Sequence, residues 1–525
     1  MKPLRIGFAT IYSWRPHVEH AHFLAQLARR AGHETFFLTC DSDLPTCYTR
    51  ELRDRPAWRE CLQCRAGGVR SYTRRNVSTI GRCAQRDATA APSKLAWSSA
   101  STLGRFESNA DYASVEFTAL AKRLHPAAQL GFQAARAWIC EQGLDAVCVF
   151  NGRMDVTRGI FEAAKSLGVR VVTLERTWFS HGLQIYPEET CMGLNSVHRL
   201  IGQWRDEPLT RRQAVLGASL AARRFLRRNS TEWRAYNLQA KQADWPVEGG
   251  RRRILLIPSS RNEVWSQPDW ESGWSDPLEA YDAVIDHLGL LPQDLVLRCH
   301  PNWSEKIGRR GGEHSERHYG DWARRRGIHT IASADTASTL ALIEHCDAIV
   351  VANGSAALEA GMLGKQVIAI APSIYQEAGF RDAVMSPEQV PTLRLQAALG
   401  ADTQATRSRL VSRLTLRFAY NMVHRVPQYT RFVRAETTTR FKYDLSADPQ
   451  RFIDLLHSGE LRADDEHSAR TTQEEDEVLQ CIERREWQRL LDQLEPEPDV
   501  RERMRRRWLY WPVDAIGQRL PIGDL

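Results

Sequence analysis

Short apolar runs alternate with amphipathic segments through two long stretches of the chain. Each run is rich in Val, Ile, Leu and Phe, and the segments between runs repeat apolar residues at spacings of three and four. Such runs predict buried parallel strands, and the intervening segments predict helices that cover both faces of a sheet. The runs of the first stretch are residues 4–10, 34–40, 145–150 and 169–175.

A second series of the same kind follows the linker-like sequence VEGGRRR at residues 247–253. Two consecutive series predict an α/β protein with two doubly wound domains that face each other, whose ligands bind at the carboxyl ends of the strands. We expect these domains at residues 1–245 and 250–425, with a mostly helical extension at residues 426–525. Residues 86–115 are expected to form a long loop. The runs of the second series are residues 254–258, 294–300, 328–331, 348–351 and 366–371.

Length and charge indicate more than one domain and exclude some classes of partner. A chain of 525 residues is too long for a single hydrophobic core. The net charge of +7 comes in local arginine clusters, and no basic patch is interleaved with stacking aromatics, so we expect no nucleic-acid partner. No run of 18 apolar residues is present, and the first apolar stretch contains Arg5 and continues into a strand pattern. We therefore expect a cytoplasmic location.

Polar residues follow two strands of the second series. The run DLVLRC ends in His300, Pro301 and Asn302, so the turn leaves a histidine at the end of a strand. The run AIVV is followed by a helix that carries Gly354, Ser355 and Glu359 near its start, where backbone amides and a hydroxyl favour a phosphate. The acid four residues after the serine can accept hydrogen bonds from a ribose. A helix-capping serine and a solvated glutamate are the alternative, but the nearby histidine favours a nucleotide site.

A resemblance supports this interpretation. The sequences LRCHPNW, AIVVANGSAALEAGMLGKQVIAI and PSIYQEAG resemble the nucleotide-binding half of bacterial capsule and O-antigen glycosyltransferases, including transferases of 3-deoxy-manno-octulosonic acid (Kdo). The resemblance implies the GT-B fold, made of two Rossmann-like domains, and a nucleotide-sugar donor, often a CMP-sugar. It also implies that His300 and Ser355 contact phosphate, that Glu359 contacts the ribose and that Tyr375 borders the pocket. Asn302 is expected to bind the nucleotide as well.

The first candidate for the catalytic carboxylate lies in the first domain. Glycosyl transfer needs a carboxylate near the anomeric carbon, and arginines can stabilise the departing phosphate. Glu175 follows a strand and is the first candidate for the base or nucleophile, although relatives carry two acids and a glycine where this chain has Glu175, Arg176 and Thr177. An ion pair with Arg153 or Arg176 is the alternative role for Glu175. The other candidates for the catalytic group are Arg153, Asp155 and Glu263.

Two further groups face the predicted cleft. Ser259 and Ser260 follow the first strand of the second domain and can contact the donor, or they cap a turn. His17 and His20 follow the first strand of the first domain and are candidates for acceptor contacts, with ordinary surface histidines as the alternative.

Four cysteines raise the question of a metal. Cys40, Cys47, Cys61 and Cys64 begin at a strand end, and their CxxC pair can hold one side of a structural zinc. An iron–sulfur cluster and unliganded thiols are the alternatives. The triplet Asp41, Ser42 and Asp43 stands apart from the nucleotide signals, and a donor with one phosphate needs no metal. We expect no cofactor for catalysis.

The predicted function is transfer of a sugar, Kdo or a related CMP-sugar, from a nucleotide donor to a surface polysaccharide or a lipid-linked saccharide. A nucleotide-sugar 2-epimerase, a polyol-phosphate transferase and a catalytically inactive nucleotide-binding subunit are the alternatives. The basic, aromatic sequence WLYW at residues 508–511 can rest on the inner membrane, where lipid-linked acceptors lie, or dock on the first domain.

Overall fold

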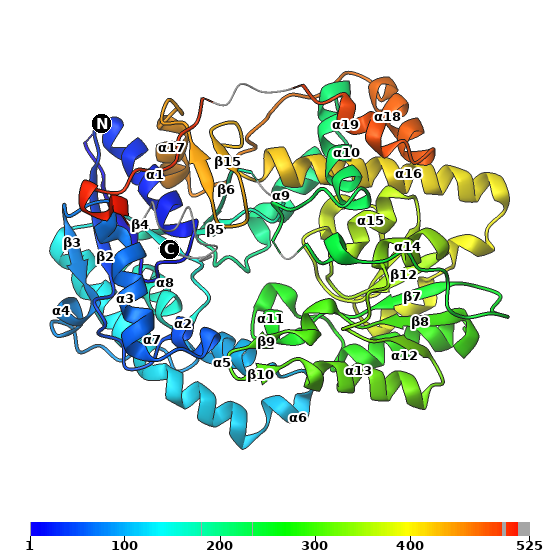
Figure 1. Cartoon of the computed structure of the whole chain (residues 1–525), viewed down its shortest axis with the longest axis horizontal. Coiled ribbons are helices and arrows are strands. Elements are labelled where there is room, and N and C mark those ends of the chain that lie inside the picture. The colour runs from blue at the N-terminus through cyan, green and yellow to red at the C-terminus, as the bar shows by residue number, and fades with distance from the viewer. Residues whose placement is uncertain (1, 180, 234, 496–499, 513–525) are drawn as a thin grey trace.

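The computed structural model describes residues 2–179, 181–233, 235–495 and 500–512. Two α/β halves lie side by side, the first in blue to cyan and the second in green to yellow (Figure 1). The first half is built on a six-stranded sheet of order β3-β2-β1-β4-β5-β6, in which β6 alone of the six pairs antiparallel. Its strands are β1 (Arg5–Ala9), β2 (Glu34–Thr39), β3 (Val77–Thr79), β4 (Ala146–Phe150), β5 (Arg170–Arg176) and β6 (Leu183–Pro187).

The second half repeats this strand order. Its sheet has the order β11-β8-β7-β12-β13-β14, and all of its pairings are parallel. The two orders are therefore the same when the strands of each sheet are counted along the chain, and both are Rossmann-like. The strands are β7 (Ile254–Ile257), β8 (Leu295–Arg298), β11 (His329–Ile331), β12 (Ala348–Val351), β13 (Gln366–Ala369) and β14 (Arg381–Ala383).

Helices cover both sheets. Those of the first half are α1 (His17–Arg30), α2 (Tyr48–Arg53), α3 (Ala57–Gly67), α4 (Ile80–Ala84), α5 (Trp97–Gly104), α6 (Asn109–Tyr112), α7 (Val115–Gln142) and α8 (Asp155–Ser166). Those of the second half are α11 (Arg261–Val264), α12 (Pro277–His287), α13 (Glu313–Arg325), α14 (Thr339–His345), α15 (Ala356–Met362) and α16 (Ala401–Tyr420). The structure confirms the strands that the apolar runs predicted. The prediction succeeds because parallel strands buried on both faces have a continuous apolar sequence.

Close helix packing in the first half depends on glycine. Helix α7 starts at Ser114, whose hydroxyl accepts a hydrogen bond from the Phe117 amide, and ends at Gly143 in the left-handed conformation. It packs along α8. A Cβ atom on Gly159 of α8 would lie 2.3 Å from the Ala128 carbonyl oxygen of α7, so only glycine permits this approach.

The chain connects the halves through α9 (Asn195–Trp204) and α10 (Arg211–Phe225). Thr210 and Gln213 form a capping box that starts α10. Although the sequence places α10 within residues 1–245, the helix packs against α15 and α16 of the second half. The connecting segment after α10 therefore runs along the second half before β7 begins.

The carboxyl-terminal extension contacts both halves. Helix α17 packs on α1, whereas α18 and α19 pack on α10 (Figure 1). The prediction of a mostly helical extension misses an antiparallel hairpin, in which each strand buries its first and third residues. Residues 513–525 of the predicted extension lie outside the described residues. The elements are β15 (Val433–Ala435), β16 (Phe441–Tyr443), α17 (Gln450–Ser458), α18 (Gln473–Glu483) and α19 (Trp487–Asp492).

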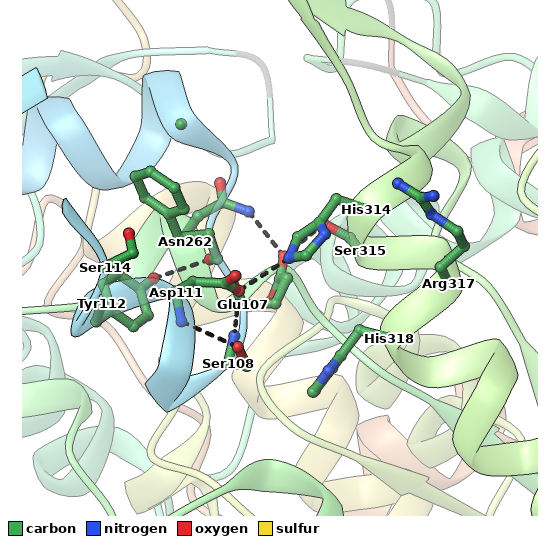
Figure 2. A network of polar contacts seen from close by, with 12 residues as sticks. Glu107, Ser108, Asp111, Tyr112, Ser114, Asn262, His314, Ser315, Arg317 and His318 are labelled. Atoms are coloured by element: carbon green, nitrogen blue, oxygen red, sulfur yellow. Dashed lines mark hydrogen bonds and ion pairs between the residues drawn. The ribbon is translucent and has the colours of Figure 1, made fainter. Parts of the chain in front are cut away.

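The predicted loop at residues 86–115 contains α5 and α6, and this part of the chain holds the two halves together. Glu107 is 1% exposed and accepts hydrogen bonds from the Arg261 amide at 2.8 Å, Asn262 Nδ2 at 2.8 Å and Ser315 Oγ at 2.7 Å. Figure 2 shows Glu107 of the first half with two of these donors, Asn262 and Ser315, from the second half. Nearby, Asp111 Oδ2 lies 2.9 Å from His314 Nε2.

Aromatic rings reinforce this junction. Trp265 of the second half stacks on Tyr112 with ring centroids 3.9 Å apart, and on Trp97 at 5.6 Å. The two Rossmann-like halves thus form the GT-B arrangement, in which the carboxyl ends of both sheets approach one interface. In the part of the chain that the structure describes, no helix is both long enough and apolar enough to cross a bilayer.

Candidate functional site

A cavity of about 410 Å³ lies at the carboxyl ends of β8, β11 and β12. We call it the first cavity. His300, Gly354, Ser355 and Glu359 line it, so the structure brings together four residues that sequence reasoning assigned to a nucleotide. Another part of the lining comes from Arg224 of α10 and from the connecting segment after this helix, which contributes Glu232, Trp233, Tyr236 and Asn237.

Glu359 is held by a buried ion pair. Arg224 Nη1 lies 2.5 Å from Glu359 Oε1, and Arg224 Nη2 lies 2.7 Å from Glu232 Oε2. Burial raises the pKa of Glu359, and the Arg224 charge opposes that rise. Glu359 is only 6% exposed, so it is not the solvated glutamate of the alternative interpretation.

One oxygen of this carboxylate stands apart from the ion pair. Glu359 Oε2 is buried and finds no hydrogen-bond partner among the residues that the structure describes. A buried acceptor without a partner costs about 1–3 kcal/mol of folding free energy. Because Glu359 lines the first cavity, a hydroxyl group bound there can supply the missing hydrogen bond.

His300 and Ser355 supply donors. His300 Nδ1 accepts from the Asn302 amide at 3.2 Å, which places the proton of a neutral imidazole on Nε2. Ser355 is exposed at the start of α15, and its side chain makes no capping hydrogen bond. The capping role considered as an alternative is therefore not the one Ser355 performs here.

The Glu175 carboxylate lies at the end of β5, among residues of the first half. Its Oε1 is 2.9 Å from His17 Nε2 and accepts from the Arg176 amide at 3.0 Å. Its Oε2 accepts from Asn151 Nδ2 at 2.8 Å. Burial raises the pKa of Glu175, whereas Arg176 lowers it. Burial and the Arg176 charge hold the pKa of His17 well below its usual value.

Arg176 connects this carboxylate with the first cavity. Its guanidinium carbon lies 3.5 Å from the ring centroid of Trp233, which lines the first cavity. The Glu175 side chain itself is 19% exposed. Glu175 is therefore an oriented, partly exposed carboxylate, and its chain neighbour Arg176 contacts a residue of the first cavity.

His20, predicted to contact the acceptor, and Asp155, a candidate for the catalytic group, lie outside the first cavity. His20 is buried beside β16, where its Nδ1 is 2.9 Å from Tyr443 Oη. Asp155 is fully buried near Tyr12 Oη at 3.3 Å, and burial raises its pKa to about 6. Neither residue lines the first cavity or the larger cavity between the halves that is described below.

Three residues of the second half that the sequence assigned to the site also lie outside the first cavity: Tyr375, Asn302 and Glu263. Tyr375 is buried and packs against aromatic rings. Asn302 is buried and donates from Nδ2 to Glu263 Oε1 at 3.1 Å. The hydrogen bond between Asn302 and Glu263 fixes the loops after β7 and β8 relative to each other. The roles of these residues in this structure are therefore in packing and loop position.

A larger cavity of about 720 Å³ lies between the halves. We call it the second cavity. Arg153 of the first half and Ser259 and Ser260 of the second half line it, rather than the first cavity. Arg153 donates to Ser98 Oγ at 2.9 Å and to the Glu263 carbonyl at 3.2 Å, so it bridges the halves. Sequence reasoning missed its four tryptophans, Trp97, Trp265, Trp270 and Trp274, although three of them are close together in the sequence.

The four cysteines line one small cavity of about 20 Å³. Burial raises the pKa of Cys47 to about 12 and also raises the pKa values of Cys40 and Cys64, which keeps these thiols protonated. Within the described ranges, no three His, Cys, Asp or Glu side chains gather as metal ligands would. The zinc at Cys40, Cys47, Cys61 and Cys64 stays a prediction.

No protein-family model matches the chain, and no curated protein matches it. Solved structures resemble it weakly. The beta Kdo 2,4 transferase of Thermosulfurimonas dismutans KpsC is 13% identical over 64% of this chain and 88% of its own, with a TM-score of 0.33. The UDP-GlcNAc 2-epimerase of Methanocaldococcus jannaschii is 11% identical over 74% and 91%, with a TM-score of 0.27. The glycosyltransferase SnogD of Streptomyces nogalater is 13% identical over 80% and 99%, with a TM-score of 0.23. These similarities place the chain in no family.

Proposed function

We propose that the chain is a glycosyltransferase that moves a sugar, Kdo or a related CMP-sugar, from a nucleotide donor to a surface polysaccharide or a lipid-linked saccharide. One observation carries the proposal: His300, Ser355 and Glu359 line the same cavity at the carboxyl ends of a Rossmann-like sheet, and Glu359 Oε2 lacks a hydrogen-bond partner among the described residues. A nucleotide monophosphate needs this combination of phosphate donors and a hydroxyl acceptor.

The donor is held at three points in this proposal. Nε2–H of His300 and the Ser355 hydroxyl donate to phosphate oxygens, and a charged acceptor makes each such hydrogen bond stronger than a neutral one. Glu359 Oε2 accepts from a ribose hydroxyl. Arg224, 2.5 Å from Glu359 Oε1, favours the ionised form of Glu359, in which the carboxylate can only accept hydrogen bonds.

Glu175 is proposed to act as the general base. The acceptor hydroxyl attacks the anomeric carbon, its proton passes to Glu175, and the bond from that carbon to the nucleotide phosphate breaks. The nucleotide leaves with the electron pair. His17 and Asn151 each contact one oxygen of Glu175, so they position the carboxylate rather than take part in the transfer.

Nucleotide binding tests the donor site. CMP, CDP, UDP and GDP are added separately, and the shift in melting temperature reports binding. We expect a shift with CMP. We expect Ser355→Ala and Glu359→Ala to weaken binding by roughly ten-fold or more, since a hydrogen bond to a charged group contributes about 1.5–3 kcal/mol. The exposed residues Ser468 and Glu466 give matched control variants. Unchanged nucleotide affinity in the two site variants would contradict the proposal.

Product analysis separates the proposed reaction from its alternatives. Transfer requires an acceptor, whereas a 2-epimerase would change a UDP-sugar in the absence of any acceptor. Phosphate retained in the product would indicate a polyol-phosphate transferase. Nucleotide binding with neither transfer nor donor hydrolysis would indicate an inactive binding subunit.

A further inference from the structure

We propose that the second cavity binds the saccharide acceptor, as a short chain of sugar rings that stack on Trp270 and Trp274. This inference rests on the proposed function of the first cavity, because it assigns the other substrate of the same transfer. The sequence placed acceptor contacts at His17 and His20, neither of which lines the second cavity, and assigned Arg153, Ser259 and Ser260, which do line it, to catalysis or to the donor.

The second cavity has the size and the position for this ligand. At about 720 Å³ it falls within the range of roughly 300–1,000 Å³ that holds ligands of drug size, which corresponds to more than one sugar ring. The loop between β12 and α15 borders both cavities. Ala352 and Asn353 line the second cavity, and Gly354 and Ser355 line the first. A saccharide in the second cavity therefore lies beside a donor in the first.

Trp270 and Trp274 provide the flat surfaces. Trp270 Nε1 donates to the Met192 carbonyl at 2.7 Å, and Trp274 Nε1 donates to the Val384 carbonyl at 2.8 Å. Both indoles are half-buried and line the second cavity. Since the polar edge of each ring is bonded to the backbone, each ring is fixed in place and its accessible part is aromatic carbon. The apolar C–H face of a pyranose ring is complementary to such a surface.

The other two indoles have a different role. Trp97 and Trp265 stack on each other, and Trp265 also stacks on Tyr112. Lys94 Nζ lies 4.6 Å from the ring centroid of Trp97. These contacts cover the ring faces of Trp97 and Trp265, which leaves Trp270 and Trp274 for a ligand.

Two of the arginines that line the second cavity are already engaged in polar contacts. Arg158 Nη2 is 2.8 Å from Glu162 Oε1, so its charge is compensated. The Arg153 guanidinium already donates to hydroxyl and carbonyl oxygens of both halves. Ser259 Oγ is buried and lacks a hydrogen-bond partner among the described residues, and a sugar hydroxyl can provide one.

A printed array of bacterial surface oligosaccharides, including Kdo-containing ones, tests the inference. We expect the wild-type protein to bind a subset of these saccharides. Trp270→Ala and Trp274→Ala should each weaken that binding at least ten-fold while the melting-temperature shift with CMP stays unchanged. Trp508→Ala is the control, because Trp508 is 71% exposed and distant in sequence from the second cavity.

Variants that keep the fold guard against a trivial loss. Trp270→Phe and Trp274→Phe retain an aromatic face and should retain part of the binding, and Ser259→Ala should weaken it without removing a ring. Two results would overturn the inference: saccharide binding that both Trp→Ala variants retain, or a wild-type protein that binds CMP and no saccharide on the array. A wild-type protein that binds saccharides through these tryptophans and binds no nucleotide would contradict the proposed donor site instead.

Discussion

The buried carboxylate at the junction of the halves gives the protein a pH-dependent stability. Glu107 is 1% exposed, and burial raises its pKa from 4.5 to about 7, although Ser315, the Arg261 amide and Asn262 donate to it. A difference of this size corresponds to about 3 kcal/mol of folding free energy, at about 1.4 kcal/mol for each pKa unit.

The sign follows from proton linkage. The folded protein holds the Glu107 proton at pH values where the unfolded chain has released it, so the contribution of Glu107 is fully present below about pH 4.5. It falls as the pH rises and is lost above pH 7. Glu107→Gln removes this titration and keeps the shape of the side chain. The difference in melting temperature between wild type and Glu107→Gln should therefore change by roughly 3 °C between pH 5 and pH 8, with the melting temperature of the wild type falling relative to that of Glu107→Gln.

Thermal unfolding at four pH values between 5 and 8 measures this difference. Contributions from Asp111, His314 and other groups cancel because both proteins contain them. Glu466→Gln, at an exposed position, is the control and should show no pH-dependent difference. A wild-type-minus-Glu107→Gln difference that stays constant over this range would refute the argument that Glu107 is the titrating group.

Three further predictions concern activity, the ion pair and helix packing. Glu175→Gln should lower kcat by at least 100-fold with little change in KM, and steady-state kinetics with full turnover retained would assign the base elsewhere. Arg224→Met should destabilise the protein by about 3–5 kcal/mol, because it leaves two carboxylates buried together; an unchanged melting temperature would contradict this. Gly159→Ala should lower the free energy of unfolding by about 1–3 kcal/mol, because the added Cβ clashes with α7. Gly320→Ala in helix α13 is the control: its added Cβ meets nothing within 4 Å, so this variant should be neutral or stabilising by up to about 1 kcal/mol. Equal melting temperatures for the two variants would show that α7 and α8 can move apart at no cost.

Most of the two sheets could be predicted from the sequence, because strands buried on both faces need apolar side chains throughout. The exceptions are the edge strands β3, β6 and β14. β3 (VST) and β14 (RDA) are only half-buried and carry no apolar run, whereas β6 (LQIYP) is buried but its sequence is interrupted by Gln184 and Pro187. Helix α5 was missed for another reason: its sequence WSSASTLG is made largely of small residues, which let it pack closely but give it no amphipathic period.

The candidate site divides in the same way. His300, Ser355 and Glu359 could be identified because each follows a strand whose end is predictable. Arg224 could not, since its partner Glu359 is far along the chain and nothing in the local sequence indicates the pairing. Tyr375, next to a predicted strand, was expected at the cavity, but its ring turns into the core. Position along the chain predicts where a residue lies, and packing decides which way its side chain points.

The segment that joins the halves also forms one side of the first cavity, through Arg224 and Trp233. A molecule bound there touches the connection between the two bodies as well as the sheet that anchors it. A nucleotide bound there, as proposed, would therefore link the connecting segment to the sheet of the second half.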